Sequence, residues 1–313
     1  MNVMHTPETD PISAVLIVGS MAFDDLELPS GTATDVVGGS ATYAALAASL
    51  FAPARVVAVV GTDFPEATFT QLRQRGVDTQ GVVRADGRTF RWSGRYASDL
   101  SSRTTLDTQL NVFAHFRPKL PPAYRDSRIV LLGNIHPQLQ LEVLDQVQTP
   151  RIVAADTMNY WIDGERPALL RVLKQIDTLI INDEELRQLA GLYNIRRAAR
   201  AVQELGPRRL IVKRGEHGAL LFDETGLFVA PAFPLDTEID PTGAGDTFAG
   251  ALLGHLATRL TNEAPNLRQS LLTAAAVASF CVQGVGTDRL STLDRGQLAQ
   301  RVAELKGLID LRD

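Results

Sequence analysis

The sequence predicts an α/β protein with a doubly wound, mainly parallel sheet that is flanked by helices. Three observations support this fold class. Short apolar runs alternate with stretches of helical periodicity, a hairpin pattern follows the last of these runs, and one polar, β-prone excursion interrupts the alternation. Continuous apolar runs are typical of strands that are buried on both faces of a parallel sheet.

Six apolar runs are the expected strands of the large sheet. They cover residues 14–18, 55–60, 128–132, 151–155, 178–181 and 209–212. Helical patterns lie between them, over residues 41–51, 66–75, 138–147 and 184–190. Strand–helix alternation at this spacing is typical of a doubly wound fold.

Two segments depart from this alternation. Residues 219–222 and 227–230 flank an Asp-Glu-Thr-Gly turn and are expected to form an antiparallel hairpin. From about residue 81 to 111 the chain is polar and β-prone, which predicts a small β-sheet lid together with a segment near 21–37. Such a sheet cannot bury both faces alone, so it should cover a ligand site, a second subunit or both. No linker sets it apart, and residues 1–313 are expected to form one domain.

The composition excludes several classes of function. The chain has 31 basic and 36 acidic residues and no basic run, which argues against nucleic acid or an anionic membrane as a partner. The single cysteine, Cys281, excludes an intramolecular disulfide and a Cys-rich zinc site. No apolar run approaches the roughly 18 residues that cross a bilayer, and the first residues lack the pattern of a signal peptide. We therefore expect a cytoplasmic protein.

The most informative stretch is Asp240-Pro-Thr-Gly-Ala-Gly-Asp246, which directly precedes an apolar helical pattern. Small residues such as Gly243, Ala244 and Gly245 at a helix amino end present free backbone N–H groups and the positive end of the helix dipole to an anion. Asp246 lies beside this anion site in the first turn. A carboxylate there can accept the proton of a hydroxyl that attacks a phosphoryl group. The alternative is that Asp246 only caps the helix and the glycines form a turn.

This motif resembles the C-terminal motif of the PfkB, or ribokinase-like, family of carbohydrate kinases, which includes nucleoside kinases. Three other segments agree in their order along the chain. Val37-Gly-Gly-Ser-Ala-Thr-Tyr-Ala44 resembles the Gly-Gly motif beside the acceptor, Asn182-Asp-Glu-Glu185 the Asn-x-x-Glu motif, and residues 212–219 the strands that line the nucleotide. The resemblance covers almost the whole chain and implies a ribokinase-like fold.

The resemblance also implies an activity, which is transfer of the γ-phosphate of ATP to a hydroxymethyl group of a sugar. Asp246 would be the general base, and the backbone N–H groups of Gly243, Ala244 and Gly245 would form the anion hole. ATP and Mg²⁺ are the implied phosphate donor and metal.

Four residues are implied on the nucleotide side. Asn182 and Glu185 would act near the phosphates, with Glu185 holding Mg²⁺ through water, because Mg²⁺ keeps much of its hydration shell. Their spacing alone equally predicts the start of a helix. Lys213 and Gly215 would border the nucleotide, although Gly215 also fits an ordinary turn.

A monovalent cation such as K⁺ is a further candidate ligand. Where the family has such a site, it uses the acid that opens the C-terminal motif, which is Asp240 in this chain. Thr242 and the turn at residues 284–286 are the other candidates.

On the acceptor side, the resemblance places a carboxylate that binds substrate hydroxyls at Asp24. Its neighbour Asp25 leaves the choice between the two open. Gly38 and Gly39 allow the backbone to approach a ligand closely. Carboxylates accept hydrogen bonds from vicinal hydroxyls, which suits a sugar or a ribose.

Ser40 and Tyr43 stand where ribose kinases of the family commonly carry lysine and asparagine, so the acceptor pocket should differ. Asn134, and either Asp156 or Asn159, follow the ends of apolar strands. Doubly wound sheets bind ligands at the carboxyl ends of their strands. Each of these residues could equally form a turn.

Aromatic residues gather in and after the expected lid. They are Phe90, Trp92, Tyr96, Phe113 and Phe116. Such a cluster is either a stacking platform for a nucleobase or a packed interface, and we expect the lid to join two subunits in a homodimer. Three functions follow: a sugar kinase, a nucleoside kinase as the alternative, and a non-catalytic sugar- or nucleotide-binding regulator. Trp92 or Phe113 pointing toward the acceptor would favour the nucleoside kinase.

Overall fold

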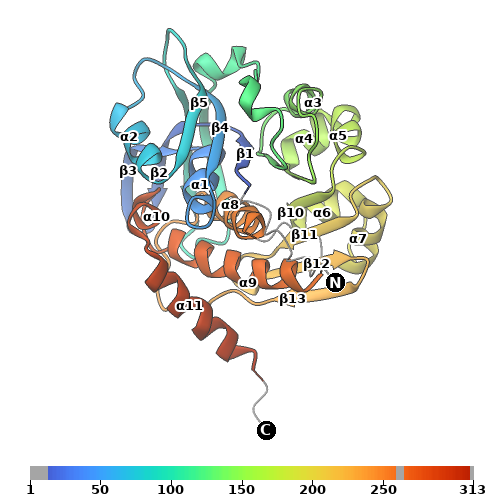
Figure 1. Ribbon diagram of the computed structural model, residues 1–313. Coiled ribbons are helices and arrows are strands. Elements are labelled where there is room, and N and C mark those ends of the chain that lie inside the picture. The colour runs from blue at the N-terminus through green and yellow to red at the C-terminus, as the bar shows by residue number, and fades with distance from the viewer. Residues whose placement is uncertain (1–12, 259–263, 311–313) are drawn as a thin grey trace, which may run out of the picture.

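The computed structural model describes residues 13–258 and 264–310. Within these residues, a nine-stranded sheet forms the body of the molecule (Figure 1). The strands of this large sheet, in spatial order, are β13 (Gly226–Ala230), β12 (Ala219–Asp223), β11 (Arg209–Lys213), β10 (Thr178–Asn182), β9 (Ile152–Asp156), β8 (Ile129–Leu132), β1 (Val15–Val18), β4 (Ala54–Val60) and β5 (Val77–Arg84).

Seven neighbouring strands of this sheet, from β11 to β5, run parallel, and β12 and β13 form an antiparallel hairpin at one edge. The order changes direction beside β1, which lies between β8 and β4. This arrangement confirms the predicted doubly wound fold and the predicted hairpin. The carboxyl ends of the central strands therefore meet at one edge of the sheet, which is where such sheets bind ligands.

Helices cover both faces of the large sheet (Figure 1). Alternate residues of β1 show the two layers, because Val15 and Ile17 belong to one buried cluster and Leu16 and Val18 to the other. The helices of the first layer are α1 (Ser40–Ala48), α2 (Glu66–Gln74), α8 (Ala244–Ala257) and α9 (Ala264–Cys281), with α10 (Asp288–Thr292) and α11 (Arg295–Leu308) packed on α9. Those of the second layer are α3 (Pro137–Leu144), α4 (Asn159–Gly164), α5 (Arg166–Leu173), α6 (Asp183–Ala190) and α7 (Ile195–Gln203).

Three short 3₁₀ helices complete the described elements. They are η1 (Asn111–His115), η2 (Pro122–Tyr124) and η3 (Gly215–His217). None of the helices within residues 13–258 and 264–310 is both long and apolar enough to cross a membrane.

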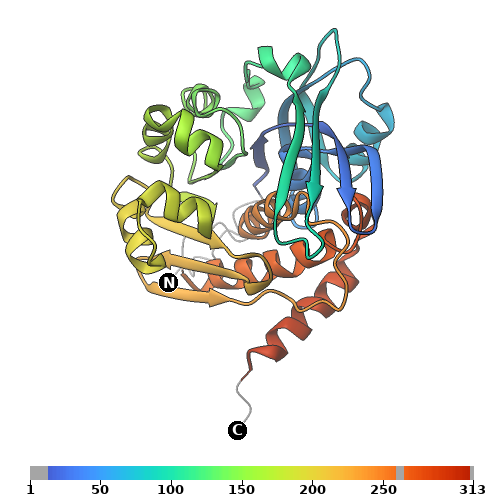
Figure 2. The ribbon, with the colours of Figure 1, turned by 180° about the vertical axis from the view of Figure 1, so that it is seen from behind.

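A separate four-stranded sheet forms the lid (Figure 2). Its strands, in spatial order, are β3 (Gly31–Gly38), β2 (Ala22–Leu28), β6 (Phe90–Tyr96) and β7 (Arg103–Gln109). The excursion begins later than the predicted residue 81. Gly81 pairs with Val57, and residues 81–84 (Gly-Val-Val-Arg) complete β5, which is an edge strand of the large sheet.

The two faces of the lid sheet differ in chemistry. Asp24 lies opposite Trp92, and Leu26 lies opposite Gly94, so these side chains share the face that also carries Tyr96. The other face carries cross-strand ion pairs of Arg91 with Asp25 and Asp35, and of Arg95 with Glu27. The homodimer that we expect through the lid stays a prediction.

The aromatic cluster divides into two parts. Phe113 stacks on Phe90 and on Phe116, with ring centroids 5.4 Å apart in both pairs. These three rings therefore pack against one another at the base of the lid. Trp92 is not part of this stack and packs against the cluster of Leu26, Leu28 and Tyr96.

Candidate active site

The amino end of α8 forms an anion-binding turn. Gly243 adopts a left-handed conformation with a φ of 74°, and a Cβ at this position would lie 2.4 Å from the ring of Tyr43. Only glycine fits there. The N–H of Ala244 donates to the carbonyl of Pro241 at 3.2 Å, and the N–H of Asp246 interacts with its own carboxylate. The N–H groups of Gly243 and Gly245 make no hydrogen bond within the described part of the chain. Two amides are thus free to bind an anion, and Ala244, which we expected among them, is already engaged.

Asp246 lies in the first turn of α8 and is half-buried. Burial, and then the negative charge of Asp156, raises its pKa to about 7. The positive charges of Lys213 and Arg103 oppose this rise. A carboxylate that titrates near neutral pH can both accept and release a proton, which is what a general base needs.

A buried ion pair lies beside the anion-binding turn. Lys213 Nζ contacts Asp156 Oδ2 at 3.0 Å, and the two side chains are 20% and 8% exposed. A Cβ on Gly245 would lie 3.0 Å from this Nζ atom, so the ammonium group stands directly against the turn. Burial lowers the pKa of Lys213, but Asp156, Glu185 and Asp246 together hold it above its usual value.

Asn182 and Glu185 form a capping box at the start of α6. Asn182 Oδ1 accepts the N–H of Glu185 at 2.7 Å, and Glu185 Oε2 accepts the N–H of Asn182 at 3.0 Å. The predicted helix start is therefore correct. Burial raises the pKa of Glu185 to about 7, and the charge of Lys213 opposes this rise.

The donor set fits Mg²⁺ held through water. Glu185 Oε2 is committed to the cap, which leaves its second oxygen available. No group of three metal-ligating side chains occurs within the residues that the structure describes. A single carboxylate is sufficient for Mg²⁺, because this ion retains waters and takes its other ligands from phosphates.

On the acceptor side, the structure separates Asp24 from Asp25. Asp24 is 5% exposed, and a Cβ on Gly38 would lie 2.0 Å from its Oδ2 atom, so Gly38 is required for this close approach. Burial, and then the charges of Asp240 and Asp246, raises the pKa of Asp24 to about 7. Asp25 faces the other way, and its hydrogen bond with Arg91 lowers its pKa although burial raises it.

Tyr43 forms a wall between the two glycine motifs. Its side chain is 1% exposed, and its ring contacts the positions that a Cβ would take on Gly38 and Gly243. Its hydroxyl is buried and has no hydrogen-bond partner within residues 13–258 and 264–310. Burial raises its pKa well above the usual value, so the hydroxyl stays protonated and can donate to a bound ligand.

Gly39 and Ser40 support the backbone. Gly39 has a φ of 91°, and a Cβ there would lie 2.5 Å from the carbonyl oxygen of Ser20. Ser40 and Ser20 exchange hydrogen bonds, each hydroxyl accepting the other's N–H at 3.1 Å. Ser40 therefore ties α1 to the chain after β1, and the substrate contact that we expected of it stays a prediction.

Two other expected residues have local structural roles. Asn134 accepts the indole N–H of Trp161 at 2.8 Å and donates to the sulfur of Met158 at 3.2 Å. These contacts hold α4 on β8. Gly215 is exposed and has a φ of 54° at the start of η3. It therefore forms the ordinary turn that the sequence predicted as its alternative role.

Asp240 is fully buried. Its two oxygens accept the N–H groups of Thr242 at 2.8 Å and Gly286 at 2.9 Å, and no basic side chain pairs with it in the described part of the chain. A buried carboxylate without a basic partner fits a charge that is balanced by a bound cation. The Thr242 hydroxyl also shares a hydrogen bond of 2.9 Å with the hydroxyl of Tyr96 on the lid.

Two residues of this site could hardly be identified from the sequence. Asp156 was one of several strand-end candidates, and only its contact with Lys213 singles it out. Arg103 of β7 had no signal, because nothing in a polar lid strand marks the residue whose charge reaches the body. Its positive charge lowers the pKa values of Asp24, Glu185 and Asp246.

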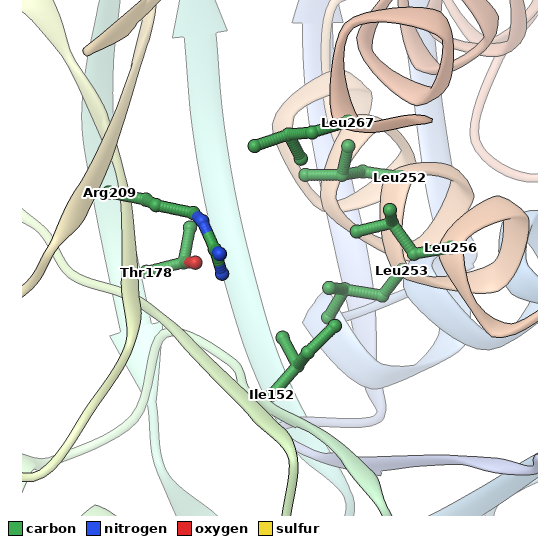
Figure 3. Close-up of a pocket in the computed structure, with 7 residues that line it drawn as sticks. All are labelled: Ile152, Thr178, Arg209, Leu252, Leu253, Leu256 and Leu267. Atoms are coloured by element: carbon green, nitrogen blue, oxygen red, sulfur yellow. The ribbon is translucent and has the colours of Figure 1, made fainter. Parts of the chain in front are cut away.

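A small cavity lies elsewhere, between α8, α9 and the large sheet (Figure 3). Its volume is about 10 Å³, enough for one water at most. Ile152, Thr178 and Arg209 line it, and each is the first residue of its strand. The cavity is therefore at the amino ends of the strands, opposite the cluster around Asp246, and is a packing defect beside the leucines of α8.

A family model described as "pfkB family carbohydrate kinase" matches residues 10–293. Among known proteins, a cytidine kinase of Thermococcus kodakarensis is 28% identical over 245 residues, which cover 76% of this chain and 87% of that protein. A ribokinase of Arabidopsis thaliana is 31% identical over 184 residues, 54% of this chain and 46% of that protein.

Solved structures share the fold at low identity. The Arabidopsis thaliana ribokinase complexed with ribose and ATP has a TM-score of 0.73 at 23% identity, covering 93% of this chain and 98% of that one. The aminoimidazole riboside kinase of Salmonella enterica, complexed with aminoimidazole riboside and an ATP analogue, has a TM-score of 0.74 at 22% identity, covering 92% and 99%.

Proposed function

The chain belongs to the pfkB family of carbohydrate kinases, and on that premise we propose that it transfers the γ-phosphate of ATP to a hydroxymethyl group of a sugar. Asp246 is the general base. The amides of Gly243 and Gly245 stabilise the charge that develops on the transferred phosphoryl group. The Ala244 amide joins them when it gives up its hydrogen bond of 3.2 Å to the Pro241 carbonyl and donates to the anion instead.

One observation carries this proposal: the Asp246 carboxylate, whose pKa is raised to about 7, lies in the same helical turn as the unpaired amides of Gly243 and Gly245. The acceptor oxygen attacks the γ-phosphorus, its proton passes to Asp246, and the bond from that phosphorus to the bridging oxygen breaks to release ADP. The amides are fixed before the reaction, so they stabilise the transition state without reorganising.

Asp24 binds the hydroxyl groups of the acceptor. Its carboxylate is buried next to the Gly-Gly turn, and its pKa responds to the charge of Asp246, which supports a short separation between the two. Asp24 therefore orients the sugar while Asp246 handles the proton. Carboxylates bind vicinal hydroxyls through strong, charge-assisted hydrogen bonds.

Glu185 would hold Mg²⁺ through water, beside Asn182, and Lys213 would contact the nucleotide phosphates. Bound Mg²⁺ neutralises charge on the phosphates. Asp240 and Thr242 are the proposed site of a monovalent cation, because the Asp240 carboxylate is buried without a basic partner among the described residues.

A nucleoside is the second candidate acceptor, and the position of Trp92 favours it. Trp92 lies directly opposite Asp24 in the lid, on the same face, and its indole lies over Gly94 and donates to Thr105 at 3.2 Å. An aromatic ring on the face that carries the proposed ribose-binding carboxylate offers a stacking surface for a base, which would displace the Arg103 guanidinium that lies over this ring. The match to a cytidine kinase over 76% of this chain supports the same candidate.

Replacing Asp246 with asparagine tests the proposal. We expect Asp246→Asn to lower turnover by about a hundredfold or more, the scale of losing a general base, while ATP binding measured by calorimetry is retained. Asp294→Asn is the matched control, because Asp294 caps the exposed start of α11 and asparagine caps equally well. Turnover of Asp246→Asn within twofold of the wild type would remove Asp246 from the mechanism.

A screen of ADP release over free pentoses, hexoses and nucleosides separates the two acceptor classes. Phosphorylation of pentoses or hexoses alone supports the sugar kinase. A clear preference for nucleosides over free ribose supports the second candidate. No ADP release with any of them would contradict both.

A further inference from the structure

Lys213 and Asp156 come from strands that are not neighbours. Lys213 is the last residue of β11, Asp156 is the last residue of β9, and β10 lies between them. The ion pair of 3.0 Å therefore crosses the carboxyl end of β10, where Asn182 begins the capping box. This places the pair at the edge of the sheet that faces the amino end of α8.

The ammonium group of Lys213 has unused donors. It carries three N–H groups, and its one hydrogen bond within the described residues goes to Asp156. Burying such a group is costly unless its donors are satisfied. The nearest backbone on the other side is Gly245, where a Cβ would lie 3.0 Å from Nζ. The unused donors thus stand beside the amides that bind the anion.

Asp156 is itself fixed in place. Its Oδ1 accepts the N–H of Thr157 at 2.8 Å, and its carbonyl accepts the side-chain amide of Gln140 at 3.0 Å. Gln140 is 1% exposed and donates at 3.0 Å to the carbonyl of Gly133 as well. Asp156 is therefore held from β8, β9 and α3 at once, and can hold Lys213 in one orientation.

We propose that Lys213 binds the phosphoryl group during its transfer, as the cationic member of the anion-binding turn, and that Asp156 is its positioning residue. This inference rests on the proposed kinase function. In this role, Lys213 adds a fixed positive charge to the anion site that the amides of α8 form. A buried ion pair contributes little to stability compared with apolar residues of the same size, so folding stability alone does not explain this pair.

The charges around Asp246 give the inference a distinctive signature. The titratable groups that interact with Asp246 come from both sheets and from the helices of the first layer. They are Asp24, Tyr43, Arg103, Asp156, Lys213 and Cys281. Of the two members of the ion pair, Asp156 raises the pKa of Asp246 and Lys213 lowers it. Removing one or the other should therefore move the titration of Asp246 in opposite directions.

Nucleotide binding is the first test. With Mg²⁺ present, we expect Lys213→Met to weaken a non-hydrolysable ATP analogue about tenfold or more, while ADP affinity changes less than twofold. Lys213→Arg should restore part of the loss, because it keeps the charge. Lys306→Met, at an exposed lysine of α11, is the matched control. Equal losses for ADP and the analogue, or no loss for either, would overturn the inference.

The pH profile of kcat/KM is the second test, and it separates positioning from a structural role. Activity should rise with pH as Asp246 loses its proton. We expect this limb to move to lower pH in Asp156→Asn and to higher pH in Lys213→Met. A shift of this limb in the same direction in both variants, or no shift, would overturn the inference. The kinase function is tested separately by Asp246→Asn. Failure of the wild type to bind the analogue would instead overturn the proposed function.

Discussion

The central strands of the large sheet are almost entirely buried, whereas the outer strands of the lid are exposed. All residues of β1, β8 and β9 are buried, while every residue of β7 and half of the residues of β3 are exposed. Apolar side chains from both helical layers fix the large sheet. The lid depends on cross-strand ion pairs and on a small cluster of Leu26, Leu28 and Tyr96.

This difference divides the site into a fixed half and a half that can move. Asp246, Lys213 and Asp156 lie on elements of the body, where dense packing holds them. Asp24 and Arg103 lie on the lid, whose few buried contacts give it a lower local stability. We therefore expect the proposed phosphate-binding groups to be in place before substrate arrives, and closure of the lid to bring the acceptor to them.

Exchanging the two neighbouring lid carboxylates for amides should have very unequal effects on catalysis. We expect Asp24→Asn to raise the KM for the acceptor by about tenfold to a hundredfold, the scale of losing a charged hydrogen bond. Asp25→Asn is the matched control, because it removes the same charge one residue along the strand. Its ion pair with Arg91 lies on the other face, so its KM should change less than twofold.

Equal effects of the two substitutions on acceptor KM would contradict the assignment of the two faces of the lid. Such a result would mean that the charge of the lid as a whole, and not the contact made by Asp24, attracts the acceptor.

The same Asp24 substitution should act in the opposite sense on stability. The pKa of Asp24 is raised to about 7, so ionising it costs free energy in the folded state and the wild type loses stability as pH rises from about 4 to 7. We expect Asp24→Asn to melt at a higher temperature than the wild type at pH 8, with the difference vanishing near pH 4. Thermal unfolding followed by circular dichroism at both pH values measures this.

A lower melting temperature of Asp24→Asn at pH 8 would contradict the prediction. It would indicate that the ionised Asp24 is satisfied by its surroundings. A gain in stability combined with a loss of acceptor binding is the expected trade-off at a functional carboxylate.

The large sheet could be predicted more fully than the site. A continuous apolar run predicts a buried strand from the local sequence alone. The residues of β9, for example, are buried whichever strands become their neighbours. The position of Asp246 in the first turn of a helix also followed from its neighbouring residues alone. The start of the lid did not, because residues 81–84 (Gly-Val-Val-Arg) are too short a run to mark a strand of either sheet, and only pairing with β4 makes them part of the large sheet.

Contacts between distant segments account for what the sequence could not reveal. Asp24 and Asp25 alternate on one strand, so a choice between them required the register of the lid. The partner of Ser40 is Ser20, across the turn after β1, and the partner of Lys213 is two strands away. Residue types predicted the chemistry of the site, but the pairing of these side chains depends on the finished fold.

The smallest expected effect concerns the attachment of the lid to the body. The hydroxyls of Tyr96 and Thr242 share a hydrogen bond of 2.9 Å, which joins β6 to the turn before α8. Tyr96→Phe removes this bond and keeps the ring, so the lid should lose about 0.5–1.5 kcal/mol of attachment. We expect faster hydrogen exchange in β6 and β7, a KM for the acceptor raised a few-fold and more ATP hydrolysis relative to transfer, because a looser lid admits water.

Tyr193→Phe, at a tyrosine that is 87% exposed, is the control. Unchanged exchange in Tyr96→Phe would mean that the apolar cluster alone holds the lid, and both halves of the site would then be equally fixed.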